Sequence, residues 1–235
     1  MRHIVEAGTD AAGVALFDPG ALPEDFDLRM QDDPIGFLEK LQQDGKAFYT
    51  ETGGDGRYLL HAYVDEPIPP NLEDHLRDPI TIERFSIPTG HLYFTGSEYA
   101  FRQDDSLLRR YPHMGGSLTV PAGDYRLTIH RAEYPPNHLE KLLRSETGAA
   151  AFLLHQSMGW FVILAIAAVP GLVFSYFAMA RNEWLWYVVP AAVVLLALPF
   201  IVVRLGPYRE ARERFKVIQQ EYPSIVARLE KPASG

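Results

Sequence analysis

Cysteine is absent from this chain of 235 residues. Its absence excludes disulfide bonds, thiolate metal sites and a cysteine nucleophile. Basic residues are in the minority as well. There are 22 Lys and Arg against 30 Asp and Glu, which gives a formal net charge of −8 at pH 7. A net charge of this sign argues against a general nucleic-acid binder.

Formal charge is missing altogether from two long stretches. Thr147–Ala180 contains no Asp, Glu, Lys or Arg, and neither does Trp184–Val203, WLWYVVPAAVVLLALPFIVV. A helix that crosses about 30 Å of hydrocarbon needs roughly 20 apolar residues. We therefore predict a transmembrane hairpin with helices over 158–180 and 184–203. The alternative is a buried helical hairpin of a soluble protein, which two such runs joined by Arg181–Glu183 disfavour.

Aromatic and basic residues flank the two apolar stretches and predict how they sit in a membrane. Interfacial aromatic anchors are expected at Trp160, Trp184, Trp186 and Tyr187. Basic residues gather after the second stretch, at Arg204, Arg209, Arg212, Arg214 and Lys216. The positive-inside rule then places both termini in the cytoplasm. The N-terminal MRHIVEAGTDAAG has no apolar signal core. These patterns predict a two-pass protein of the bacterial inner membrane.

The charge is divided unevenly along the chain. Residues 1–148 hold 14 Lys and Arg against 25 Asp and Glu, a net of −11, whereas residues 149–235 hold 8 against 5, a net of +3. The predicted boundaries are an acidic β-rich cytoplasmic head at 1–134, a linking helix at 135–157, the two transmembrane helices, and an amphipathic cytoplasmic tail at 207–235.

Short alternating runs separated by Gly and Pro predict a head made mainly of strands. The expected strands are His3–Ala7, Val14–Phe17, Ala47–Thr50, Arg57–Val64, Ile80–Ile87, His91–Thr95, Ser117–Val120 and Tyr125–Arg131. Two helices are expected as well. Asp33–Gly45 has an N-cap aspartate, a proline at the first helical position and a closing glycine, and Pro136–Ser145 has an apolar leucine face.

The two halves of the head repeat a pattern. TDAAGVALF at Thr9–Phe17 corresponds to SIPTGHLYF at Ser86–Phe94, and GRYLLHAYV at Gly56–Val64 corresponds to GDYRLTIHR at Gly123–Arg131. We interpret the head as a duplicated β-sandwich or barrel in which each half contributes about four strands. Chance similarity between strand-and-turn segments is the alternative.

One stretch carries a resemblance to a known family. VPAGDYRLTIHRAEY at Val120–Tyr134, preceded by IPTGHLYFTGSEY at Ile87–Tyr99, resembles bacterial β-sandwich proteins of the competence protein J, or nuclease-inhibitor, type and related domains found beside polymorphic toxins. The resemblance covers roughly a quarter of the chain. It implies a non-catalytic module that binds and neutralises a partner, often a nuclease. The predicted hairpin is a departure from that pattern.

Motifs for catalysis, metal or cofactor binding do not stand out. None of the eight histidines forms HExxH or another tight metal pattern, and no Walker A, GxSxG or GxGxxG sequence occurs. His61 and His130 fit ordinary sheet histidines, and His155 fits a wetted position at the membrane entrance. We therefore expect no catalytic residues, no metal, no cofactor and no enzyme activity.

The last segment has an apolar stripe at heptad spacing. Its members are Phe215, Ile218, Tyr222, Ile225 and Leu229, with Pro223 interrupting them. Because of Pro223, the helix is expected either to end near Tyr222 or to restart there. It is predicted to pack on the head, to lie on the membrane surface, or to pair with another chain.

The leading functional hypothesis is a membrane-anchored protein-binding module, in its sharpest form an immunity-like inhibitor of a toxin or effector. A head of net charge −11 favours a basic protein partner. The expected partners are thus the lipid bilayer, a basic protein and further copies of the chain, without nucleic acid. Two alternatives stay open: a membrane-tethered enzyme or ligand sensor with a site in the head, and a subunit of an envelope or secretion assembly. Candidates for the partner-binding face are Tyr93, Tyr99, Phe101, Tyr111 and Tyr134.

Overall fold

The computed structural model describes residues 1–178 and 185–232. They form two compact units, the first made of Met1–Tyr134 and Tyr222–Gly235 and the second of Pro135–Glu221. The strands are β1 (Arg2–Thr9), β2 (Gly13–Phe17), β3 (Ala47–Glu51), β4 (Gly56–Val64), β5 (Leu76–Ile87), β6 (His91–Gly96), β7 (Gly115–Thr119), β8 (Gly123–Ala132) and β9 (Ile225–Glu230). The helices are α1 (Phe26–Arg29), α2 (Pro34–Gln43), α3 (Pro70–Glu73), α4 (Ser106–Arg110), α5 (His138–Ala178), α6 (Leu185–Arg204) and α7 (Gly206–Glu221). Short 3-10 helices occur at Pro19–Ala21, Ser97–Tyr99 and Pro112–Met114.

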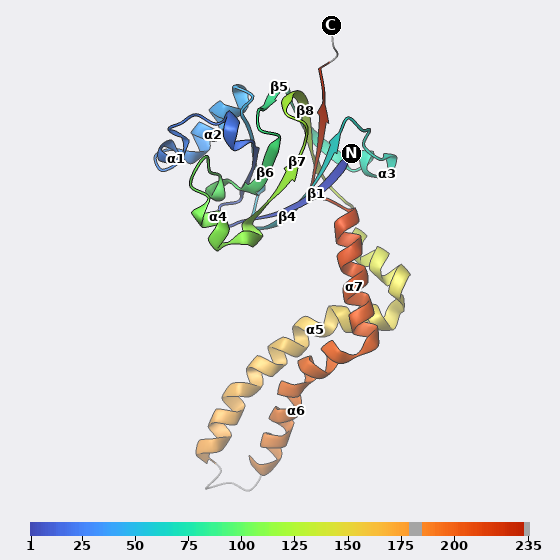
Figure 1. The fold of residues 1–235 in the computed structure, drawn as a ribbon. Helices are drawn as coiled ribbons and strands as arrows, with labels where there is room; N and C mark the ends of the chain where they lie inside the picture. The colour runs from blue at the N-terminus through green and yellow to red at the C-terminus, as the bar shows by residue number, and fades with distance from the viewer. Residues whose placement is uncertain (179–184, 233–235) are drawn as a thin grey trace. The chain divides into compact units, whose positions relative to one another are not determined.

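The first unit is a β-sandwich (Figure 1). Its larger sheet has the strand order β1-β4-β9-β8-β5 and its smaller sheet the order β3-β2-β6-β7. All eight strands predicted in the head are present, as is the helix predicted at Asp33–Gly45, while the helix predicted at Pro136–Ser145 is the start of α5 in the second unit. The sandwich alternative is confirmed and the barrel alternative is wrong, because the described strands stay in two separate sheets.

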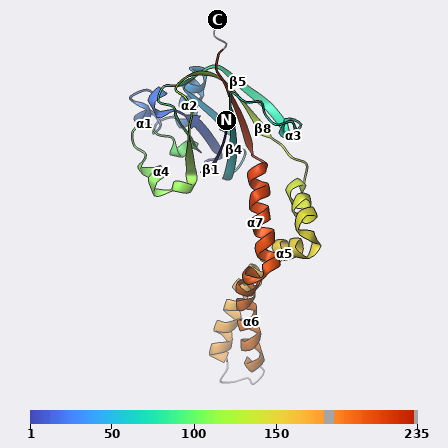
Figure 2. The same ribbon diagram turned by 45° about the vertical axis from the view of Figure 1, so that its right-hand side comes forward.

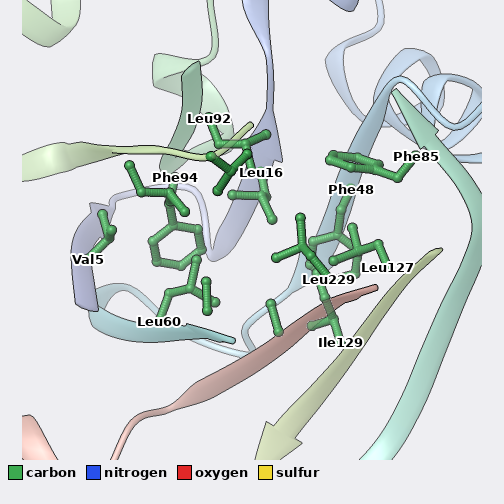
Figure 3. Packing of buried hydrophobic residues seen from close by; sticks show 14 of the residues in the cluster. Val5, Leu16, Phe48, Leu60, Phe85, Leu92, Phe94, Leu127, Ile129 and Leu229 are labelled. Atoms are coloured by element: carbon green, nitrogen blue, oxygen red, sulfur yellow. The ribbon is translucent and has the colours of Figure 1, made fainter. Parts of the chain in front are cut away.

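Most of the apolar core lies between the two sheets, where alternate residues of each strand meet (Figure 3). Leu16 and Phe94 of the smaller sheet face Leu60, Leu127 and Leu229 of the larger one, and all five are at most 1% exposed. A second apolar cluster covers the outer face of the smaller sheet, where α1 and α2 contribute Phe26, Phe37, Leu38 and Leu41.

The strand order confirms that the two halves of the head share one topology. If the labels β1 to β4 are exchanged with β5 to β8, each sheet keeps its strand order, read from the opposite edge. At the centre of the smaller sheet the register pairs Leu16 directly with Phe94. In the larger sheet, β4 and β8 begin at Gly56 and Gly123, whose φ angles are 151° and 150°. The longer connection in the first half holds α1 and α2.

One detail of the predicted repeat is shifted by a residue. The sequence comparison aligned Gly13 with Gly90. In the structure the residue with a left-handed backbone is Ala12, at φ 50°, and its equivalent is Gly90, at φ 79°. Glycine has no steric cost in this region, whereas alanine does. The turn conformation is therefore the same although the glycine is not at the same place.

A tyrosine fixes the start of β4 and of β8 in the same way. The Tyr58 hydroxyl donates to the carbonyl oxygen of Gly54 at 2.7 Å, and the Tyr125 hydroxyl donates to that of Pro121, also at 2.7 Å. Both bonds reach back four residues, as in the tyrosine corner of other sandwiches. The repeated Gly-x-Tyr pattern thus marks a repeated hydrogen bond.

Carboxylates cross-link the two halves in a reciprocal way. Asp18, which follows β2 and is 0% exposed, accepts from the backbone N–H of Thr89 at 2.8 Å and from its hydroxyl at 2.7 Å. Glu98, which follows β6, accepts from the backbone N–H of Asp10 at 2.6 Å and from the hydroxyl of Thr9 at 3.1 Å. Each half therefore closes the first turn of the other with charge-assisted bonds.

The most consequential difference from the sequence prediction is β9. The end of α7 at Glu221 agrees with the predicted stop near Tyr222, but Ile225–Glu230, expected as part of an amphipathic tail, forms a strand. This strand lies between β4, to which it is parallel, and β8, to which it is antiparallel. Figure 1 draws it at the red end of the colour scale, beside β8. Val226, Ala227 and Leu229 are 0% exposed because this strand is covered on both faces.

The second unit is helical. Its first helix, α5, is broken at Gly148 (φ 79°, ψ 164°), so the linking helix predicted at 135–157 is two segments. α5 packs against α6 and α7, and Figures 1 and 2 both draw α5 and α6 side by side. The His155 ring lies 5.0 Å from the Phe215 ring and 6.0 Å from the Tyr208 ring. Thus α7 buries its apolar face on α5, a site that none of the three sequence alternatives named.

The described part of the chain contains one helix, His138–Phe174, that is long and apolar enough to cross a membrane. Val189–Arg204 passes the same criterion only together with Gly206–Glu221, from which it is bent by 62°. The second predicted span is therefore less well supported than the first.

The shared topology predicts equal roles for the two tyrosines. Tyr58→Phe and Tyr125→Phe should each lower the free energy of unfolding of the sandwich by about 1 kcal/mol, since each removes one hydrogen bond. Tyr93→Phe is the control, because none of the bonds described for this chain involves its hydroxyl. Urea unfolding of the full chain in mild detergent, followed by near-ultraviolet circular dichroism, measures the three values. If the losses in unfolding free energy of Tyr58→Phe and Tyr125→Phe differ by more than twofold, the two tyrosine corners are not equivalent.

The position of β9 predicts a second result. A chain that ends at Glu221 should lose cooperative unfolding of the sandwich, because β4 and β8 lose the strand between them, whereas a chain that ends at Lys231 should retain it. Limited proteolysis of both chains in detergent provides the measurement. Equal resistance of the two chains would contradict the central role of β9.

Candidate functional site

The two sheets approach closely along one side of the sandwich, where β1 faces β7. A Cβ atom placed on Gly116 would come within 2.6 Å of Val5 Cγ1, and one on Gly8 within 2.7 Å of Met114 Sδ. Real Cβ contacts are not this short, so a side chain at either position would force Val5 or Met114 to shift. This side of the sandwich is closed.

The equivalent side, between β5 and β3, is built differently. β1 pairs with β4 in an unbroken register, but β5 pairs with β8 with shifts between Arg77 and Ile80 and between Ile82 and Phe85. Within the first shift Asp78 adopts a left-handed backbone, at φ 49°, and Pro79 has no N–H to donate. Such irregularities bend an edge strand away from its neighbours.

A cavity of about 380 Å³ lies on this side of the sandwich. We call it the seam cavity. Its lining is shared by β3, β4, β5, β8 and β9 and consists of Phe48, Thr50, Glu51, Thr52, Tyr58, Asp78, Ile80, Ile129, His130, Arg131, Ala132, Ser224 and Ile225. Phe48, Ile129 and Ile225 belong to the core between the sheets and are buried. The seam cavity thus joins an apolar floor to a polar rim.

Three charged side chains line the rim of the seam cavity. Arg131, at the end of β8, donates from Nη2 to the carbonyl oxygen of Thr52 at 2.9 Å, which holds its guanidinium across the gap between the sheets. Glu51 ends β3, and Asp78 occupies the irregular part of β5. Within residues 1–178 and 185–232, these three side chains form no ion pair. Charges of both signs are therefore available to a ligand.

His130 follows Ile129 on β8, so strand alternation turns its imidazole to the opposite face of the larger sheet, where it lines a second cavity with Thr128 and Arg228. Burial lowers the pKa of this half-buried imidazole, because the charged form loses solvation. A neutral imidazole near neutral pH can donate one hydrogen bond and accept another. No group of three or more His, Asp or Glu side chains in the described ranges is placed to hold a metal ion.

The aromatic residues expected on one partner-binding face lie in three places. Phe101 is 8% exposed and packs with Phe17 and Tyr93 in the cluster that covers the smaller sheet. Tyr99 and Tyr111 form an edge-to-face pair with ring centroids 6.1 Å apart, and Tyr111 is 37% exposed. Of the five residues, Tyr111 alone is exposed.

Tyr134 serves the fold instead. Its hydroxyl donates to the carbonyl oxygen of Pro223 at 2.9 Å, and its ring lies 4.9 Å from that of His75 and 5.3 Å from that of Tyr222. Burial is the main cause that raises the pKa of this phenol. Tyr134 thus ties the end of the β8 segment to the segment that leads into β9.

The expected membrane anchors are accessible where they are described. Trp160 is 68% exposed and Tyr187 is 81% exposed. Trp184 lies outside the described residues, as does the side chain of Trp186. The five basic residues of the positive-inside argument are exposed, at the end of α6 and along α7.

Comparison with known proteins adds little to this geometry. No protein-family profile and no curated protein matches the chain. One solved structure, described as crocagin biosynthetic gene J, is similar over 60% of this chain and 82% of its own, with 14% identity and a TM-score of 0.41. The resemblance to nuclease inhibitors therefore stays a sequence-based expectation.

Sequence reasoning did not identify the three rim charges. Glu51, Asp78 and Arg131 come from strands that are far apart in the chain, and β9, which supplies part of the floor, was expected to be helical. One signal was present in the sequence: Asp78–Pro79 directly precedes the predicted strand Ile80–Ile87, and a proline at a strand is typical of an edge strand or a bulge. Bulges are frequent next to binding sites.

The lowered pKa of His130 predicts how stability depends on pH. The folded state disfavours protonation, so the contribution to stability is present above the ordinary histidine pKa of 6.5 and is lost as pH falls below it. His130→Gln should therefore make the loss of thermal stability between pH 7.5 and 5.5 smaller than in the natural chain. The control is His91→Gln, which changes an exposed histidine. If the melting temperatures of the natural chain and of His130→Gln depend on pH in the same way, the lowered pKa of His130 is wrong.

Proposed function

We propose that this chain is a membrane-anchored ligand-binding module. Its helical unit crosses the bacterial inner membrane as a hairpin, and its sandwich lies in the cytoplasm with the seam cavity as the binding site. The observation that carries the binding role is the seam cavity, which unites an apolar floor with three charged groups that form no ion pairs among the described residues. Ligand cavities commonly combine these two features.

Exposed apolar side chains support the anchor. In the most apolar stretch of α5 only 11% of the residues are buried, whereas the core helix of a soluble protein would be mostly buried. Ile163 is 54% exposed, Ile166 66% and Phe174 65%, and on α6 Val194 is 58% and Phe200 73% exposed. Exposed apolar surface of this extent is unfavourable in water and favourable in hydrocarbon.

The connections to the sandwich suit an inserted hairpin. The chain leaves the sandwich after β8 and returns at β9, and Arg131 near the end of one strand is paired with Ile225 at the start of the other. The two points of attachment are therefore neighbours in one sheet. A helical hairpin whose ends lie close together fits such a connection.

The distribution of charge favours a cytoplasmic sandwich. The first unit carries 14 Lys and Arg against 24 Asp and Glu, a net of −10, and the second carries 8 against 6, a net of +2. Arg209, Arg212, Arg214 and Lys216 follow the second apolar segment directly. Such clusters are retained on the cytoplasmic side.

A second candidate function is recognition of a basic protein, with toxin immunity as its sharpest form. The net charge of −10 favours it, because an acidic surface attracts a basic partner and speeds encounter. Tyr111, which is exposed and pairs edge-to-face with Tyr99, offers an aromatic contact for such a partner. The dispersed positions of the other expected aromatics favour the seam cavity over this alternative.

The absence of cysteine makes the topology directly testable. Three single-cysteine variants serve as probes: Gln103→Cys in the sandwich, Asn182→Cys between the apolar segments and Glu213→Cys on α7. Intact spheroplasts that contain each variant are treated with a membrane-impermeant maleimide. We expect labelling of Asn182→Cys alone, and labelling of all three after permeabilisation. The natural chain, which has no thiol, is the blank.

Two other patterns would each overturn part of the proposal. Labelling of Gln103→Cys and Glu213→Cys alone in intact spheroplasts would reverse the orientation. Extraction of the natural chain by alkaline carbonate would refute the membrane span, because spanning helices resist that treatment.

A further inference from the structure

We propose that the ligand of the seam cavity is a small zwitterion with one apolar body. Arg131 would hold its carboxylate, Glu51 and Asp78 its ammonium group, and the floor of Phe48, Ile129 and Ile225 its apolar part. This inference rests on the ligand-binding role proposed above and adds the chemical class of the ligand.

The Arg131 guanidinium is held by one hydrogen bond and has further N–H groups that can donate to a ligand. One bond, from Nη2 to the Thr52 carbonyl oxygen at 2.9 Å, fixes the guanidinium between the two sheets. A guanidinium has five N–H donors in a rigid fork, and the described residues make no ion pair with this one. A carboxylate matches that fork with two parallel hydrogen bonds.

The two acids lie on the strands that form the opening, one on each sheet. Glu51 is the last residue of β3, and Asp78 lies in the register shift of β5. Asp78 has a left-handed backbone at φ 49°, a conformation that an aspartate tolerates better than most residues. The bulge that opens this side of the sandwich thus also brings a carboxylate to its rim.

The balance of charge selects among ligands. Two carboxylates beside one guanidinium disfavour a phosphate or another polyanion, which would be repelled. A simple cation would use the acids and leave the Arg131 guanidinium without a partner. A ligand with one carboxylate and one ammonium group uses both kinds of charge.

The edges of the seam argue against a peptide strand as the occupant. On β3 the backbone N–H of Tyr49 is already bonded to Gln42 Oε1 at 2.8 Å. On β5 Pro79 has no N–H, and the two register shifts distort the edge. Strand addition needs a regular row of free backbone groups. The volume of about 380 Å³ lies at the low end for ligand cavities and fits a single apolar body.

The test uses three probes with the same phenyl body. L-Phenylalanine carries both charges, 3-phenylpropanoate only the carboxylate, and 2-phenylethylamine only the ammonium group. Titration calorimetry on the full chain in lipid nanodiscs at pH 7 should show L-phenylalanine binding at least about tenfold more tightly than either single-charge probe, since each lost charge pair removes on the order of 1.4 kcal/mol or more.

Variants connect each charge to its partner. Arg131→Gln should weaken L-phenylalanine and 3-phenylpropanoate by about tenfold and leave 2-phenylethylamine within about twofold. Glu51→Gln combined with Asp78→Asn should weaken L-phenylalanine and 2-phenylethylamine and spare 3-phenylpropanoate. The control is Arg126→Gln, which removes a positive charge from the same strand, together with its ion pair to Glu83, at a residue outside the cavity lining. Arg131→Lys, which keeps the charge, and the melting temperature of each variant separate loss of binding from loss of folding.

Three outcomes would count against the inference. If 2-phenylethylamine or 3-phenylpropanoate binds as tightly as L-phenylalanine, and the rim variants weaken it, the zwitterion is wrong and the ligand-binding role stands. If L-phenylalanine binds the natural chain and a stable Arg131→Gln variant equally, the assignment of Arg131 is wrong. If no probe binds up to millimolar concentration, both this inference and the proposed ligand-binding role fail.

Discussion

The sandwich depends on β9, the strand that comes after the helical unit in the chain and occupies the centre of the larger sheet. Its backbone joins β4 to β8, and its apolar side chains fill both faces of the sheet: Ile225, Ala227 and Leu229 enter the core between the sheets, and Val226 packs with Tyr63 on the other side. Without it the two halves of the larger sheet would have no hydrogen bonds between them. The seam cavity depends on it as well, since Ile225 forms part of its floor.

The second organising feature is an approximate symmetry and the place where it fails. Equivalent strands, equivalent tyrosine corners and the reciprocal carboxylates Asp18 and Glu98 make the two halves alike. The edges differ: β1 meets β7 through glycines, whereas β5 pairs with β8 irregularly and lines the seam cavity together with β3. The seam cavity lies on the side where the strand pairing is irregular. The seam cavity is therefore a product of the broken symmetry.

Local patterns predicted the elements of the head, and non-local contacts decided the rest. Alternation, turn glycines and the capped helix at Asp33 were sufficient to place eight strands and α2, because those features act over a few residues. β9 was missed because Phe215, Ile218, Tyr222, Ile225 and Leu229 have helical spacing, while its burial on both faces depends on partners more than 90 residues away in the chain. Arg131, Glu51 and Asp78 meet only after both sheets have formed, so no local pattern indicated them.

The late position of β9 along the chain has a consequence for biosynthesis. When a ribosome has made the first eight strands, β4 and β8 each present an apolar, unpaired edge, and the helical unit must still be translated before the missing strand emerges. During that interval the nascent head exposes the kind of edge that recruits other strands. A truncated product keeps that edge permanently exposed, so that incomplete chains become recognisable substrates for proteolysis.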